Sequence, residues 1–199
     1  RIWASEHQAE KALAMLMPIL AQDEVLASDL YDAGALAAYA GKEEQREEIV
    51  GVVSKRLDEF TALAQRYEGQ ARSFGYSMVG EALSIQGRDA EAVEAHRESL
   101  RAATDHLPEI SVDALTQNFL EEENHRGLVA IKELQYDFVE DDSDKALLAV
   151  DVARLYMDQL DDFENAESTF LQCLEWDEGC ADAMAGLGDL CFTQGRFED

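Results

Sequence analysis

The 199-residue chain has little proline, cysteine, aromatic or basic residue content, and each shortage narrows the class of protein. Only two prolines interrupt it, which leaves long stretches free to form helices. Its three cysteines, Cys173, Cys180 and Cys191, lack metal-like spacing and are read as small apolar residues in a reducing compartment. No run approaches the roughly 18 apolar residues of a membrane-spanning helix, so membrane insertion is not expected.

Basic residues are far outnumbered by acidic ones. Sixteen Lys and Arg against 43 Asp and Glu give a formal charge of −27. A surface of this sign repels nucleic acids and anionic lipids, so neither is expected as a partner. With 47% hydrophobic residues the chain is too apolar for a disordered acidic tail. Three explanations of the acidity stay open: a basic partner, solubility, or adaptation to high salt. The even spread of the acidic residues favours solubility for most of them.

Helical periodicity runs through most of the chain, whereas alternating strand patterns are absent, which predicts an all-α fold. Three segments carry two glycines seven residues apart, at Gly34–Gly41, Gly80–Gly87 and Gly188–Gly195. The first glycine lies within a predicted helix, where it is tolerated when a neighbouring helix approaches closely. The second lies where a helix ends, because glycine accepts a positive φ. Each segment is therefore predicted to be a helix, a tight turn and the start of a second helix.

These segments resemble the tetratricopeptide repeat family, whose unit is 34 residues long. The clearest match is the sequence from Tyr76 through Gly80, Leu83, Gly87 and Ala92. The distance from the second-helix alanine to the small residue of the next unit is 22 residues in three places, as the family pattern requires: Ala12–Gly34, Ala92–Ala114 and Ala166–Gly188. The resemblance covers about three-quarters of the chain and implies a right-handed α-solenoid of antiparallel helix-turn-helix units.

The predicted array occupies residues 1–199 as one domain with partial units at both ends. Its units are 1–26 (partial), 27–72 (extended), 73–106, 107–145 (irregular), 146–180 and 181–199 (partial). Residues 43–67 keep helical spacing throughout, so one extended second helix is expected there. Because the chain begins at Arg1 rather than Met and stops where another helix should start, we expect it to be part of a longer protein, with self-association through the incomplete ends as a further possibility.

No catalytic or cofactor-binding constellation is found, and we expect neither enzymatic activity nor a cofactor or metal. The run from Glu121 to His125 has neighbouring ligands that fan outward around a helix instead of sharing a face. The aspartates near Asp141 lack the spacing of a calcium loop, and Ser143 or Asp144 is expected to cap a helix instead. Nucleophile, Walker-type and dinucleotide motifs are absent. A standalone enzyme is the least favoured hypothesis.

The resemblance implies that partner segments bind in a groove formed by the first helices. Within that groove lie Val150 and Asp182, together with the residues predicted to bind protein: Tyr31, Ala35, Tyr39, Phe74, Ser77, Glu81, Arg154, Met157, Asp189 and Phe192. The Lys/Asn clamp with which some family members hold acidic chaperone tails is missing from these positions, so that activity is not expected. Aromatic anchors among carboxylates suit a neutral to basic or apolar peptide. The alternative is that these aromatic residues only pack between units.

The function predicted from these observations is a scaffold or adaptor that binds a peptide or helix of a partner protein. The alternative is a helical-repeat sensor or substrate-recruiting region of a larger enzyme or transcription regulator. A cytoplasmic location is the default expectation for a chain with this use of cysteine.

Overall fold

The described part of the chain is helical. The computed structural model describes residues 11–15, 17–18, 33–34, 37 and 42–195, and no strand occurs among them. The elements of residues 42–195 are α3 (Glu43–Lys55), α4 (Leu57–Ala64), α5 (Gly69–Ile85), α6 (Asp89–Ala102), α7 (Glu109–Glu121), α8 (His125–Gln135), the short 3₁₀ helix η1 (Tyr136–Phe138), α9 (Asp142–Gln159), α10 (Phe163–Trp176) and α11 (Ala181–Gln194). The predicted all-α class is confirmed, while the right-handed sense of the solenoid stays a prediction.

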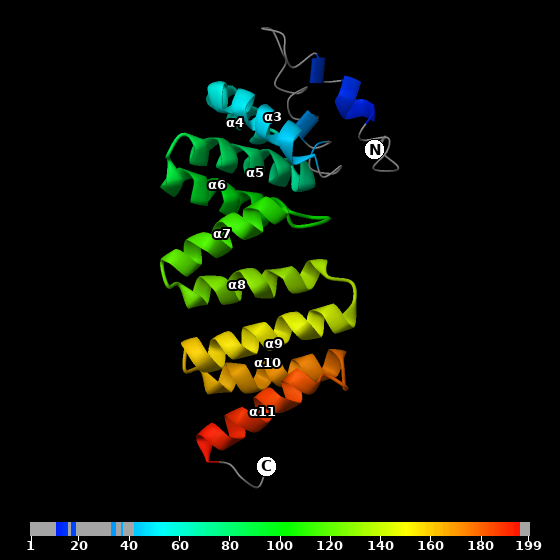
Figure 1. Cartoon of the computed structure of the whole chain (residues 1–199), viewed down its shortest axis with the longest axis vertical. Coiled ribbons are helices and arrows are strands. Elements are labelled where there is room, and N and C mark those ends of the chain that lie inside the picture. The colour runs from blue at the N-terminus through cyan, green and yellow to red at the C-terminus, as the bar shows by residue number, and fades with distance from the viewer. Residues whose placement is uncertain (1–10, 16, 19–32, 35–36, 38–41, 196–199) are drawn as a thin grey trace. The chain divides into compact units, whose positions relative to one another are not determined.

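The helices belong to two compact units, Arg1–Leu115 and Thr116–Asp199, and α7 crosses the boundary between them. In the N-terminal unit, α5 packs against α3, α4 and α6, and α5 and α6 form an antiparallel pair (Figure 1). Its core includes the fully buried side chains of Ile49, Phe60 and Met78. The apolar faces of neighbouring helices supply this core.

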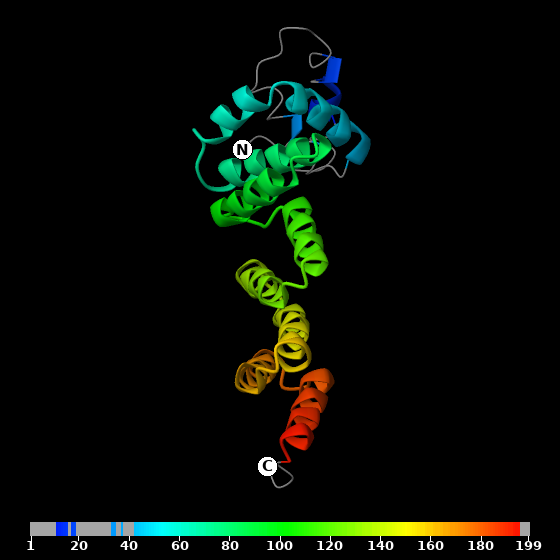
Figure 2. The same ribbon diagram turned by 90° about the vertical axis from the view of Figure 1, so that its left-hand side faces the viewer.

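The C-terminal unit repeats this arrangement with α9 and α10 as its central pair. In this unit α8 packs against α9, and α11 packs against both α10 and α9 (Figures 1 and 2). Ala149, Ala153, Phe170 and Cys173 are buried in its core. Since α9 and α11 are the first helices of successive predicted units, their contact leaves a shared surface on which residues from both can lie.

The stretch from 43 to 67 forms two helices, contrary to the extended second helix expected from its spacing. Helix α3 ends at Lys55, and Arg56 adopts φ −125° and ψ 33°, outside the helical region, before α4 begins at Leu57. The apolar periodicity survives because Val53, Leu57 and Phe60 are buried on both sides of the break. Periodicity reports which face is buried, and a short interruption leaves it unchanged.

The turns follow the predicted backbone chemistry. Gly87 and Gly195 both have φ 68°, in the left-handed region that glycine tolerates. In the turns without glycine, Glu123 and Asp161 take this conformation themselves, with φ 52° and 50°. The cap of α9 is Asp141, whose Oδ1 accepts hydrogen bonds from the backbone N–H groups of Ser143 (2.9 Å) and Asp144 (3.1 Å), so the expected cap at Ser143 or Asp144 is wrong by two or three residues.

Close helix approach was predicted at the first glycine of each pair, and the structure bears this out at two of the three. A methyl group at Gly34 would collide with the side chain of Met78, and one at Gly80 with the ring of His96. At Gly188 no atom of the described residues lies within 4 Å of such a methyl group. In α11 the close approach falls instead at Gly186, which faces the ring of Phe170.

Candidate functional site

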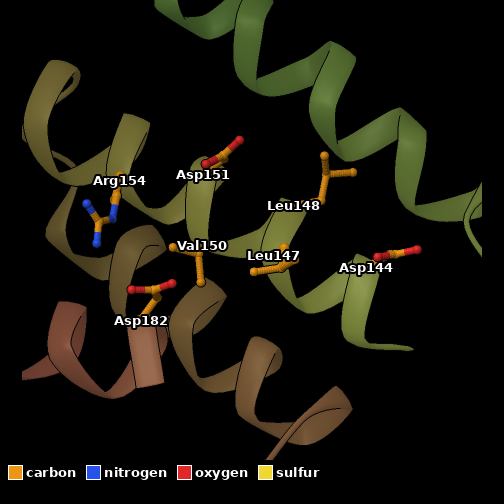
Figure 3. Close-up of a pocket in the computed structure, with 7 residues that line it drawn as sticks. All are labelled: Asp144, Leu147, Leu148, Val150, Asp151, Arg154 and Asp182. Atoms are coloured by element: carbon orange, nitrogen blue, oxygen red, sulfur yellow. The ribbon is translucent and has the colours of Figure 1, made fainter. Parts of the chain in front are cut away.

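An open hollow of about 450 Å³ lies in the C-terminal unit along α9 and the start of α11. It is lined by aspartates, one arginine and aliphatic side chains (Figure 3). We call it the α9–α11 hollow; its lining residues are Asp144, Leu147, Leu148, Val150, Asp151, Arg154 and Asp182.

Helix α9 places most of this lining on one face. From one to the next, Asp144, Leu147, Asp151 and Arg154 are three or four residues apart, and such spacing brings side chains to the same side of an α-helix. Val150 lies at the floor and is 6% exposed, whereas Leu147 is 55% exposed and open to a ligand. The hollow therefore offers an aliphatic surface between charged side chains.

The turn between α10 and α11 positions the remaining residue, Asp182. Asp177 holds this turn, because its carboxylate accepts the backbone N–H of Gly179 at 2.9 Å and its carbonyl accepts that of Cys180 at 3.0 Å. Helix α11 begins directly afterwards, with Asp182 in its first turn. A carboxylate there is favoured by the helix dipole, so this negative charge is well placed without a basic partner.

The charges of the hollow differ in how they are neutralised. Lys132 of α8 donates to the Asp151 carboxylate at 2.9 Å. For Asp144, Arg154 and Asp182, no ion pair within 4.0 Å is found among residues 42–195 or the shorter described stretches. Three ionic side chains are thus available to a ligand.

A second polar contact holds α8 against α9 beside the hollow. The hydroxyl of Tyr156 donates to Glu133 at 3.0 Å, and burial together with this carboxylate raises the pKa of Tyr156 to about 12. Tyr136 packs its ring edge against Trp176 with centroids 5.3 Å apart. Burial raises the pKa of Tyr136, so both phenols stay neutral and serve the packing of the unit.

The predicted groove residues have different fates in the structure. In the N-terminal unit, Ser77 is fully buried and donates to the carbonyl of Phe74 at 2.8 Å. Glu81 forms a two-point ion pair with Arg46, whose Nη2 donates to the Oε2 atom of Glu81 at 2.6 Å and whose Nε donates to it at 3.1 Å. The Arg46 guanidinium also lies 5.8 Å from the centre of the Phe74 ring. Glu81 and Phe74 therefore contribute to the packing of α3 on α5, whereas the hydroxyl of Ser77 is bonded within α5 itself.

The predicted residues in the C-terminal unit are more accessible. Arg154 lines the hollow, Asp189 is exposed and Phe192 is 74% exposed, whereas Met157 is half-buried against the core. Tyr31, Ala35 and Tyr39 lie outside the described residues. The sequence-based prediction missed Asp144, Leu147, Leu148 and Asp151. The spacing of Asp144, Leu147, Asp151 and Arg154, three or four residues from one to the next, already placed them on one face of the helix.

The described residues were also compared with the requirements of a metal site and of a membrane-spanning helix. They contain no group of three or more His, Cys, Asp or Glu side chains arranged to hold a metal ion. Of the helices between residues 11 and 195 that the structure describes, none combines the length and apolar character needed to cross a membrane.

Comparison with known proteins agrees with this architecture. Residues 150–180 match the family model of the tetratricopeptide repeat, a segment that begins within α9, includes all of α10 and ends at the cap of α11. A comparison with curated proteins finds no match. This repeat suggests protein–protein interaction in general. The match covers one repeat, and together with the neighbouring helix pairs it supports a helical-repeat architecture of the tetratricopeptide type.

Proposed function

We propose that the chain is a non-enzymatic scaffold that binds a short segment of a partner protein in the α9–α11 hollow. The observation that carries this proposal is the exposed aliphatic surface at Leu147, bordered by ionic side chains that lack partners among the described residues. A partner that covers Leu147 gains from removing apolar surface from water, and the surrounding charges select its polar groups.

The side chains of the hollow are also held in place by the rest of the unit. Its floor at Val150 is part of the unit's core, and Asp151 is fixed by Lys132 from the neighbouring helix. A rigid surface loses little conformational freedom on binding, so more of the contact energy appears as affinity. Arg154 was predicted as a protein-binding residue, and its position in the lining supports this part of the proposal.

The test is selection of peptides from an unbiased display library on the full chain, followed by affinity measurement with two matched variants. Leu147 and Leu171 are similarly exposed, at 55% and 50%, but Leu171 lies on α10 and outside the hollow. We expect Leu147→Ala, which removes apolar surface without adding charge, to weaken binding of the selected peptides by about tenfold, equivalent to about 1.4 kcal/mol. Leu171→Ala should leave it unchanged. Equal sensitivity to both substitutions, or to neither, would refute binding in this hollow.

A further inference from the structure

The partner segment that fits the hollow can be specified further by charge. We propose that it is an extended segment with two basic side chains, four residues apart, on either side of an aliphatic residue. This inference rests on the proposed function and names the ligand of the same site.

The first step is the charge that remains after internal pairing. Lys132 neutralises Asp151, which leaves Asp144 and Asp182 as two carboxylates unpaired by any described residue, against the single guanidinium of Arg154. The whole chain, these residues included, carries a formal charge of −27. A basic segment is therefore attracted both by the hollow and by the surrounding field, whereas an acidic segment or a second copy of this chain is repelled.

The second step is the position of the charges. Figure 3 shows Asp144 at one end of the lining and Asp182 near Val150 and Arg154 at the other, with Leu147 between them. Along α9 the rise from Asp144 is about 9 Å to Val150 and about 15 Å to Arg154. The two free carboxylates thus border the aliphatic surface from opposite ends.

The third step matches a ligand to this spacing. Alternate side chains of an extended segment point to one side, and four residues span about 13 Å at about 3.3 Å per residue. A segment of the form Lys-x-Leu-x-Lys, where x is any residue, therefore presents all three key side chains to the hollow. Its leucine covers Leu147, and the aliphatic stems of its lysines lie along the same surface while their ammonium groups reach Asp144 and Asp182.

The effect of substituting Arg154 on affinity distinguishes a basic ligand from an acidic one. Its guanidinium lies at the Asp182 end and repels a basic ligand there. Removing this positive charge in Arg154→Gln is therefore expected to strengthen binding of the dibasic peptide by about twofold, as for an exposed charge pair. For an acidic ligand the same substitution would weaken binding, because Arg154 would then be the group that holds it.

The experiment measures fluorescence anisotropy of a labelled Lys-Ala-Leu-Ala-Lys peptide, blocked at both ends, titrated with the full chain at low salt. Asp144→Asn and Asp182→Asn are each expected to weaken binding by about two- to fivefold, with a smaller effect at high salt. Asp158→Asn is the matched control, because Asp158 is an exposed aspartate of α9 that does not line the hollow and its loss changes the net charge equally. It should have no effect.

Three results would overturn the inference: equal weakening by Asp158→Asn and Asp144→Asn, weaker binding in Arg154→Gln, or tighter binding of a Glu-Ala-Leu-Ala-Glu peptide. Failure of the inference is distinguishable from failure of the proposed function. Library peptides that are sensitive to Leu147→Ala but carry acidic or no charges would keep the binding function and refute the charge pattern. If no library peptide responds to Leu147→Ala, both are refuted.

Discussion

Two glycines of α11, two residues apart, are expected to respond in opposite ways to the same substitution. A methyl group at Gly186 would overlap the ring of Phe170, whose Cε2 atom would lie at 2.9 Å, and this ring is fully buried and cannot turn outward. At Gly188 a methyl group meets no described atom within 4 Å. Because both positions are helical, the intrinsic helix propensity changes equally in the two variants, and their difference isolates the packing.

The magnitudes follow from two terms. Replacing glycine by alanine inside a helix stabilises it by about 1 kcal/mol, which is the whole effect expected for Gly188→Ala. For Gly186→Ala an overpacking cost of about 1–3 kcal/mol opposes this gain, so a net loss of up to about 2 kcal/mol is expected. The two variants should therefore differ by about 1–3 kcal/mol in the free energy of unfolding.

Equilibrium urea unfolding followed by circular dichroism measures this difference. A double-mutant cycle with Phe170→Leu provides the control: once the ring is gone, Gly186→Ala should lose most of its cost, while the effect of Gly188→Ala should stay the same. If Gly188→Ala destabilises the chain as much as Gly186→Ala, α11 packs through a different face and the assignment of Gly186 as the close-approach residue is refuted.

Three further predictions concern buried polar groups. Burial, with a smaller contribution from the charge of Arg46, lowers the pKa of His96 from 6.5 to about 4. As the pH falls the unfolded state therefore binds the proton first, and the free energy of unfolding should decrease by up to about 3 kcal/mol between pH 6.5 and 4. Urea unfolding at a series of pH values measures this decrease, which His96→Gln should reduce. Burial raises the pKa of the Cys173 thiol to about 12, so a thiol reagent at pH 8 should modify half-buried Cys191 well before Cys173, as peptide mapping would show. Glu81→Gln should destabilise the chain by about 1–3 kcal/mol in thermal or urea unfolding, because it leaves the guanidinium of Arg46 with a weaker partner; an unchanged midpoint would contradict a structural role for this pair.

The helical class and the turns were predictable because they depend on local constraints. Periodic apolar residues predict helices wherever they occur, and the left-handed conformation at Gly87 and Gly195 follows from glycine itself. The 22-residue spacing from Ala166 to Gly188 also spans a real pair of helices, α10 and α11. These features relate residues that are neighbours along the chain, and so one sequence is enough to find them.

Which residues pack against each other was less predictable, because packing brings together residues that are distant in the sequence. Gly188 occupies the family position for a close approach, yet Gly186 is the residue that contacts the preceding helix. The break at Arg56 leaves the apolar periodicity intact and so was invisible to pattern analysis. Within the candidate site, Arg154 was identified from its repeat position; the spacing of Asp144 and Asp151 places them on the same helix face, but does not tell that this face of α9 stays open.

Two acidic residues at corresponding repeat positions show how the same slot acquires different roles. Glu81 and Asp189 each directly follow the first glycine of a predicted pair. Glu81 is held by Arg46, which lies 35 residues earlier on α3, and its side chain is only 19% exposed, while Asp189 remains exposed on α11. A carboxylate that already holds an internal guanidinium must break that pair to bind a ligand, whereas an exposed one pays no such cost. The availability of acidic groups for binding is therefore set by whether a neighbouring helix supplies a basic residue. By that criterion Asp144 and Asp182 are better placed than Glu81 to receive a basic partner.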